Sequence, residues 1–496
     1  MSMAAFPALR GGNQDIALIE GDARHSYAAL ESCVKACARG LLNGKADLGQ
    51  ERIAVLIPAG RDYATALHGV WRAGGIAVPL NVAAKAPELE HCLLQAGVSR
   101  VMTSRQHPVA IGPLCEKLGI GASHADDTQD AGRQQRPLPS VEESRAAMIV
   151  FTSGTTSRPK GAVLTHQAVR AQVTMLVEAW RWTRNDSIPL FLPLHHLHGI
   201  INVLSCALWS GATVHAMPKL DAVRLCEQIA GGVFSVLMAV PTVYVKLIEH
   251  IESLPAPQRK TVCDGFQRMR LNVSGSAACP ARVFARWKEL TGQALLERYG
   301  ATETGMAISN PYDGERRAGF VGQPLPGVMA QLFDENDQPV EKEAVPGEVR
   351  VRGEAVFQGY WNDERATRNS FINGWFRTGD IAVVENGYYR ILGRSSIDII
   401  KSGGYKVSAL EVEDALLGHE AIREAAVIGL PDETWGEIVA AAVTLKDGAS
   451  LGLDGLKQWC AGRMSAYKAP RRLKVMDALP RNAMGKVVKA ALRDLL

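Results

Sequence analysis

Short apolar segments alternate with amphipathic segments between Arg52 and Gly300, and this alternation limits the folds that the chain can adopt. The apolar segments predict buried strands at residues 52–57, 146–151, 234–239 and 269–273. The amphipathic segments predict helices near residues 63–72, 167–181 and 241–251. Such alternation favours parallel sheets that are covered by helices on both faces, so the predicted fold class is α/β.

The pattern of apolar and polar residues changes after Gly300. Gly- and Pro-rich β-like segments at residues 347–353 and 386–392 predict a small β-barrel or a set of hairpins. Beyond residue 393, a helix at 409–417, strands at 424–429 and 438–445 and a helix near 456–464 predict a small α+β domain. The polar stretch 121–145 is expected to be a surface connector.

Length, charge and cysteine content exclude several classes of protein. The 496 residues suggest about three domains or subdomains. A net charge of +4 argues against a dedicated nucleic-acid binder. The longest apolar stretch, at 200–209, is too short to span a membrane, and the N-terminal residues lack a secretory pattern. Nine cysteines without a CxxC pair predict reduced thiols and a cytoplasmic protein.

A loop rich in hydroxyl groups follows the predicted strand at 146–151. Glycine allows backbone N–H groups to converge on an anion, hydroxyls donate to its oxygens, and lysine supplies a charge for the outer phosphates. The loop lacks the Walker A spacing, because proline follows where Gly-Lys would stand. We interpret it as a phosphate-binding loop made by Thr152, Ser153, Gly154, Thr155, Thr156, Ser157, Arg158, Pro159 and Lys160.

This loop resembles the signature loop of the adenylate-forming superfamily of acyl-CoA synthetases, peptide-synthetase adenylation domains and luciferases. Further motifs follow in the order that the family shows: LPLHHLHG at 192–199, SGSAA at 274–278, YGATE at 299–303, TGD at 378–380, GR at 393–394, KSGGYK at 401–406 and PRNAMGK at 480–486. The resemblance covers nearly the whole chain. One departure is Ser157, where the family usually has glycine, and it predicts retuned phosphate binding at most.

The resemblance implies a role for each motif in the attack of a carboxylate on the α-phosphate of ATP. Glu303 would hold Mg²⁺ and Thr302 would donate to the α-phosphate. Asp380 would accept both ribose hydroxyls, Arg394 would add a second ribose contact, and Tyr299 would be among the ATP-binding residues. Adenine would lie against Gly275, Ser276 and Ala277. The alternatives are that Glu303 is an ordinary surface residue and that Asp380 is a turn residue.

The resemblance also implies two half-reactions separated by a domain rotation. It divides the chain into an N-terminal AMP-binding domain at 1–393, a hinge at 394–398 and a small mobile C-terminal domain at 399–496. Lys486 would bridge the carboxylate and the α-phosphate during adenylation; otherwise it would be a solvated terminal lysine. Lys401, Gly403 and Gly404 would then approach the pantetheine arm of coenzyme A.

The acid is predicted from Arg298, which stands where many relatives carry a small or neutral residue. A fixed bidentate cation suits a second carboxylate, and the wider sequence resembles the malonyl-CoA synthetase branch. We therefore expect malonate or methylmalonate, with Arg298 on the distal carboxylate and His198 and Ser274 lining the pocket. A salt bridge from Arg298 to Glu297 or another acid is the structural alternative. A metal site at His195, His196 and His198 is not favoured.

Other functions remain open at this point. A medium-chain fatty or aryl acid CoA ligase would need an apolar pocket without a buried cation. An adenylation enzyme could load a carrier protein instead of coenzyme A. A catalytically inactive binding protein is disfavoured because Lys160, Glu303, Asp380 and Lys486 are all present. The sequence leaves open whether the protein is a monomer or a dimer.

The small net charge hides a basic C-terminal end. Between Arg463 and Arg493 there are nine basic residues and one acid, a net +8, which leaves 46 basic and 50 acidic residues elsewhere. In this family context the basic end suggests contact with the triphosphate through Lys486 and with the phosphates of coenzyme A through Arg471 and Arg472.

Overall fold

The computed structural model describes residues 6–9, 12–105, 111–125, 127, 137–152, 159–481 and 487–496. Two layers of mainly parallel sheet form the largest part of it. The first sheet has the strand order β18 (Gly359–Tyr360), β8 (Lys160–Thr165), β7 (Ala146–Thr152), β4 (Ile76–Pro79), β3 (Arg52–Val55), β5 (Arg100–Thr103) and β6 (Gly121–His124). The second has the order β11 (Val236–Ala239), β12 (Leu271–Ser274), β13 (Leu296–Ala301), β14 (Gly305–Ser309) and β15 (Gln323–Pro324).

Two antiparallel or mixed sheets flank these. One has the order β2 (Ala23–Ser26), β1 (Ile16–Glu20), β10 (Thr213–Ala216) and β9 (Ser187–Leu190). The other is fully antiparallel and contains β16 (Val328–Phe333), β17 (Gly347–Gly353), β20 (Trp375–Glu385), β19 (Phe371–Ile372) and β21 (Tyr388–Arg394). This antiparallel sheet contains the segments for which the sequence predicts a small β-barrel or a set of hairpins.

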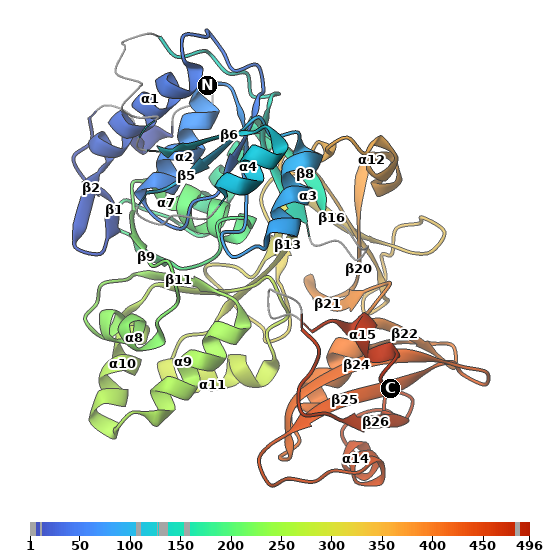
Figure 1. Ribbon diagram of the computed structural model, residues 1–496. Helices are drawn as coiled ribbons and strands as arrows, with labels where there is room; N and C mark the ends of the chain where they lie inside the picture. Colours follow the sequence, from blue (N-terminus) through green and yellow to red (C-terminus); the bar gives the residue numbers. More distant parts are fainter. Residues whose placement is uncertain are drawn as a thin grey trace.

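All strands of the last sheet come after residue 398: β23 (Tyr405–Ser408), β22 (Ile399–Ser402), β25 (Gly436–Leu445), β24 (Ile422–Asp432) and β26 (Arg472–Val475). Together with α13 (Ala409–Leu416), α14 (Leu453–Cys460) and α15 (Lys489–Arg493) they form the orange-to-red lobe of Figure 1. This lobe has apolar clusters of its own, so it packs as a separate small α+β unit, as the sequence predicts.

The remaining helices cover the sheets of the larger part. They are α1 (Tyr27–Leu42), α2 (Arg61–Arg72), α3 (Ala86–Ala96), α4 (Gly112–Leu118), α6 (His166–Ala179), α7 (Cys206–Ser210), α8 (Ala222–Ala230), α9 (Pro241–Ser253), α10 (Ala256–Arg268), α11 (Ala281–Thr291) and α12 (Glu364–Ser370), with a short 3₁₀ turn η1 (Pro7–Leu9) and a π-helix η2 (His198–Ser205). Side chains cap five of the described helices at their N-termini: Ser26 caps α1, Thr165 caps α6, Asp221 caps α8, Asp363 caps α12 and Ser408 caps α13.

The α/β fold and most predicted elements agree with the structure, with two corrections. The expectation of purely parallel sheets is wrong at the phosphate loop, because β7 and β8 pair antiparallel and Thr152 lies opposite Lys160. The stretch 121–145 is not wholly a connector, because β6 (Gly121–His124) adds a parallel edge strand beside β5. The apolar pattern marks where a strand lies without specifying the strand with which it pairs, so it predicted neither feature.

The core and the cysteines fit an ordinary globular chain. Trp71, Trp180 and Trp287 are fully buried. None of the nine cysteines, all of which lie among the described residues, forms a disulfide, and most of them are buried. Among the described residues, no helix has the length and apolar character that a membrane crossing would require.

Candidate active site

The ends of the phosphate loop lie on the first sheet. Thr152 ends β7 and Lys160 begins β8, and the Thr152 hydroxyl donates to the Lys160 carbonyl over 3.4 Å. The His91 ring and the Pro159 carbonyl are hydrogen-bonded over 3.3 Å. The predicted ligands from Ser153 to Arg158 and Lys486 lie outside the described residues, so their roles remain predictions.

Lys160 and Glu303 meet at a residue that the sequence analysis missed. The Tyr360 hydroxyl donates to Glu303 Oε1 over 2.9 Å, and Lys160 Nζ lies 5.2 Å from the centre of the Tyr360 ring. Burial and the Glu303 charge raise the pKa of Tyr360, so its hydroxyl remains a donor. Tyr360 belongs to β18, a two-residue strand paired with β8, and no local pattern marked it. Thr302 lies beside Glu303 in the half-buried turn after β13.

The Asp380 carboxylate accepts hydrogen bonds from two side chains. The Tyr299 hydroxyl donates to Asp380 Oδ2 over 2.6 Å, and Arg394 Nε donates to Asp380 Oδ1 over 3.0 Å. Asp380 and Arg394 face each other on β20 and β21, and Tyr299 comes from β13. Asp380 and Arg394, which were predicted at the ribose, are therefore brought together, and Tyr299, predicted only to bind ATP, joins them. An ionised carboxylate has further lone pairs, so two donors leave room for ribose hydroxyls.

Arg298 is buried without an acidic partner. Its residue is only 4% exposed, and the described residues provide no carboxylate within ion-pair distance. Arg298 Nη2 donates to Ser276 Oγ over 3.4 Å, while Nε has no partner. Burial lowers its pKa to about 9, so the guanidinium is still charged at neutral pH. An uncompensated buried cation is costly, which makes this position suited to a bound carboxylate.

His198 belongs to the same cluster. Its Nδ1 is hydrogen-bonded to Ser276 Oγ over 3.1 Å, and its Nε2 has no partner among the described residues. Burial, followed by the Arg298 charge, holds the pKa of His198 well below its usual value. His198 is therefore neutral. Ser276 Oγ thus contacts both Arg298 and His198 and joins the two side chains.

The predicted adenine residues take part in this cluster too. A Cβ on Gly275 would lie 2.4 Å from the Arg298 guanidinium, so only glycine fits there. Ser276 has a left-handed φ of 69°, a strained value for serine that its two side-chain contacts help to maintain. The loop thus bounds the pocket of Arg298, and contact of Gly275, Ser276 and Ala277 with adenine remains a prediction.

The neighbouring residues do not provide the salt bridge that was the alternative for Arg298. Glu297 is buried on the opposite face of β13, where Glu297 Oε1 accepts the N–H of Gly319 over 3.0 Å. The strand register pairs Ser274 with Glu297, so Ser274 lies on that face as well. Ser274 is therefore not part of the Arg298 cluster, and its predicted acyl contact gains no support.

Glu297 predicts a pH-dependent stability. Burial, together with the charge of Asp414, raises its pKa from 4.5 to about 8. Between these values the unfolded chain has lost a proton that the folded chain keeps, so stability falls as pH rises. Relative to Glu297→Gln, we expect the wild-type free energy of unfolding to fall by ~1.4 kcal/mol per pH unit in that window. Urea unfolding of both proteins at about pH 5 and about pH 7.5 measures this, and parallel pH profiles would contradict it.

The residues predicted to meet coenzyme A are exposed on the C-terminal lobe. Gly403 has a φ of 56°, and a Cβ there would lie 2.7 Å from the Trp435 ring, so this position favours glycine. The Arg471 guanidinium lies over the Trp435 ring, 3.8 Å from the ring centre. Lys401 and Gly404 are exposed nearby in the same hairpin of β22 and β23. Trp435 and its stacked arginine are a feature that spacing alone did not predict.

The three histidines do not assemble a metal site with acidic residues. The rings of His195 and His196 lie 4.1 Å apart, and burial lowers the pKa of His195 to about 3. Within the described ranges, no group of three or more His, Cys, Asp or Glu residues has the geometry to hold a metal ion.

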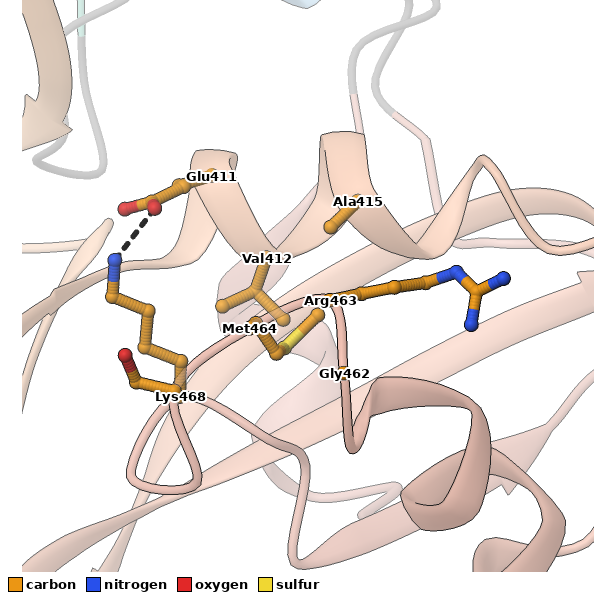
Figure 2. A pocket seen from close by; sticks show the side chains of 8 residues that line it. Glu411, Val412, Ala415, Gly462, Arg463, Met464 and Lys468 are labelled. Atoms are coloured by element: carbon orange, nitrogen blue, oxygen red, sulfur yellow. Dashed lines mark hydrogen bonds and ion pairs between the residues drawn. The ribbon is translucent and has the colours of Figure 1, made fainter.

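A separate cavity of about 500 Å³ lies on the C-terminal lobe. Figure 2 shows Val412, Ala415 and Met464 along it and the Lys468 ammonium paired with Glu411 over 2.6 Å at its edge. None of the predicted site residues lines this cavity, so it plays no part in the site.

The comparison with protein families follows the same division of the chain. The AMP-binding enzyme family matches residues 8–361, and the AMP-binding enzyme C-terminal domain matches residues 411–486. The chain belongs to the AMP-binding enzyme family. Among curated members, it is 41% identical to the mitochondrial malonate–CoA ligase ACSF3 of Bos taurus, over 97% of this chain and 88% of that protein.

Solved members of the AMP-binding enzymes share the whole fold. ATP-bound MatB from Rhodopseudomonas palustris matches with a TM-score of 0.89 at 31% identity, over 100% of this chain and 99% of that one. A malonyl-CoA ligase in a ternary product complex with methylmalonyl-CoA and AMP matches with a TM-score of 0.70 at 35% identity, over 96% of this chain and 100% of that one.

Proposed function

We propose that the chain ligates malonate, and methylmalonate as a close analogue, to coenzyme A through an acyl-adenylate. One substrate carboxylate attacks the α-phosphate of ATP, forming a carbon–oxygen–phosphorus link and releasing pyrophosphate. The thiol of coenzyme A then attacks the acyl carbon, forming the thioester and releasing AMP. The observation that carries the proposal is Arg298, a buried guanidinium without an acidic partner beside a neutral His198.

Arg298 explains why the acid should have two carboxylates. The carboxylate that reacts must reach the phosphates near Lys160 and Glu303, and a second carboxylate would compensate the Arg298 charge. Nε2 of His198 and Nε of Arg298, which have no partner among the described residues, are the polar atoms that would contact it. A monocarboxylic fatty or aryl acid would leave this cation buried and unpaired, which is unfavourable.

Glu303 is suited to a magnesium ion that accompanies ATP. Its Oε1 accepts the Tyr360 hydroxyl, and Oε2 takes no hydrogen bond from the residues that the structure describes. Mg²⁺ prefers one or two carboxylate oxygens together with substrate phosphates. Bound there, the ion would offset the negative charge of the triphosphate. The roles of Asp380, Tyr299 and Arg394 at the ribose rest on the hydrogen bonds described above and on family resemblance.

Pyrophosphate release with different acids tests the proposal. We expect malonate and methylmalonate to support release with ATP, and acetate, octanoate and benzoate to support little. Preference for octanoate or benzoate would favour a fatty or aryl acid ligase. Malonyl-adenylate formation without transfer to added coenzyme A would favour an enzyme that loads a carrier protein. If no acid supports pyrophosphate release, the chain would instead be a catalytically inactive binding protein.

We further propose that coenzyme A phosphates bind near Arg471 and Arg472. The structure reduces the number of basic residues available for these phosphates. Lys468, Arg481 and Lys489 form ion pairs with acids of the same lobe. Arg471 and Arg472 make no ion pair with the described residues, and Arg471 lies on exposed Trp435. Replacing both arginines by glutamate should raise the KM for coenzyme A at least tenfold while the KM for ATP stays within twofold. An unchanged KM for coenzyme A would remove this role.

The compartment and the oligomeric state remain predictions. The cysteine content favours the cytoplasm, whereas the bovine relative is mitochondrial by name. We propose a chain that acts on small molecules, as a monomer or a dimer, with no nucleic-acid partner.

A further inference from the structure

The connection between the two parts of the chain is a tight turn closed by an aspartate. Arg394 ends β21, and its carbonyl accepts the N–H groups of Ile397 and Asp398 over 3.1 and 2.7 Å. Asp398 Oδ2 in turn accepts the N–H of Arg394 over 3.1 Å. The Asp398 side chain therefore spans the turn and holds its first and last residues together, immediately before β22 begins.

A lysine from the end of the chain fixes that aspartate. Lys489 Nζ lies 2.6 Å from Asp398 Oδ1 and 2.7 Å from Glu413 Oε1. The side chains of all three residues are 13% to 15% exposed, unlike most ion pairs of this protein. Burial disfavours the Lys489 ammonium, but the Glu413 and Asp398 charges outweigh it and raise the pKa of Lys489. The lysine therefore stays charged and holds the carboxylate that closes the turn.

This contact connects to the hydrogen bonds around Asp380, the predicted ribose ligand. Arg394, whose N–H is held by Asp398, also donates through Nε to Asp380. A chain of charged contacts thus runs from Asp380 in the larger part, through Arg394 and Asp398, to Lys489 in the C-terminal lobe. Lys489 is also three residues after the predicted catalytic lysine in the sequence. The structure that contains these contacts matches that of ATP-bound MatB with a TM-score of 0.89.

We propose that Lys489 is a positioning residue for the adenylation half-reaction, because it holds Asp398 in the orientation that keeps the turn at 394–398 closed. This inference rests on the proposed two-step ligation. Without Lys489, Asp398 would keep a buried charge with one partner fewer, and the turn would open more readily. An open turn disfavours the arrangement that adenylation requires and leaves the thiol-transfer arrangement accessible.

Two half-reactions measured separately test the proposal. Adenylation is followed by malonate-dependent exchange of pyrophosphate into ATP, and thiol transfer by thioester formation from supplied malonyl-adenylate and coenzyme A. We expect Lys489→Met and the isosteric Asp398→Asn to slow exchange at least tenfold and to leave thioester formation within twofold. Trypsin cleavage after Arg394, which needs no catalysis, should be faster in both variants.

Two further variants separate positioning from general destabilisation. Glu413→Gln removes the other carboxylate from Lys489 without touching the turn, and we expect it to leave the ratio of the two half-reactions unchanged. Arg423→Met removes the exposed Arg423–Asp447 ion pair of the same lobe and should change neither rate. Equal loss of both half-reactions in Asp398→Asn, or the same selective loss in Glu413→Gln, would overturn the proposal.

The controls also keep the inference distinct from the proposed function. If Lys489→Met fails to fold, Asp398→Asn alone decides. If the wild-type chain shows no malonate-dependent exchange, the proposed function fails. The protection of the bond after Arg394 then remains as the test of the turn, and unchanged cleavage in Asp398→Asn would refute it.

Discussion

Replacement of Arg298 by alanine should raise the KM for malonate about 100-fold, since loss of one partner of a buried charge pair costs about 2–5 kcal/mol. The variant would leave the distal carboxylate of malonate buried beside His198 and Ser276 without a counter-charge. The KM for ATP should stay within about twofold, because no hydrogen bond or ion pair among the described residues joins Arg298 to Tyr299, Asp380 or Arg394. Steady-state kinetics with malonate and ATP varied in turn measure both effects.

A matched variant, Arg298→Lys, tests the geometry of the cation. Lysine keeps the charge but lacks the planar fork, so its KM for malonate should fall between those of the wild type and the alanine variant. Monocarboxylic acids provide the control, because their weak activity should not decline in Arg298→Ala. Malonate kinetics that do not change in Arg298→Ala would show that the distal carboxylate binds elsewhere and would remove the main support for a dicarboxylic substrate.

Replacement of Lys486 by alanine should abolish adenylation and spare thioester formation from supplied malonyl-adenylate. Two anions, a carboxylate and the α-phosphate, must approach each other in the first step, and a cation between them lowers the repulsion. The second step has no such encounter. Pyrophosphate exchange and thioester formation, measured separately, give the two rates, and the expected loss of exchange is at least about 1,000-fold, the order observed when a preorganised charge-stabilising group is removed.

Lys489→Met serves as the comparison for Lys486→Ala, because both variants remove a cation from the same end of the chain. A direct catalytic role predicts a much larger loss for Lys486 than for Lys489. Equal loss of both half-reactions in Lys486→Ala would mean that this lysine maintains the fold rather than the first step.

The sequence predicted the order of the elements better than their partners. The strands at β17 and the helix at α13 lie where apolar patterns placed them, within a residue or two. The antiparallel pairing of β7 with β8 and the edge strand β6 were not predicted, because pairing joins segments whose local patterns contain no information about each other. Ser274 shows the same limit at the level of one side chain, since the register of β12 and β13 decides which face it occupies.

The sequence by itself identified the chain as an AMP-binding enzyme, because its phosphate loop and the motifs that follow it in order resemble those of the adenylate-forming superfamily. Only the tertiary structure decided that Arg298 has no acidic neighbour, that Tyr360 joins Lys160 to Glu303 and that Lys489 holds the turn at Asp398. Each of these facts depends on side chains brought together from distant segments. Packing of the sheets and of the C-terminal lobe creates those neighbours, and residue spacing along the chain does not specify them.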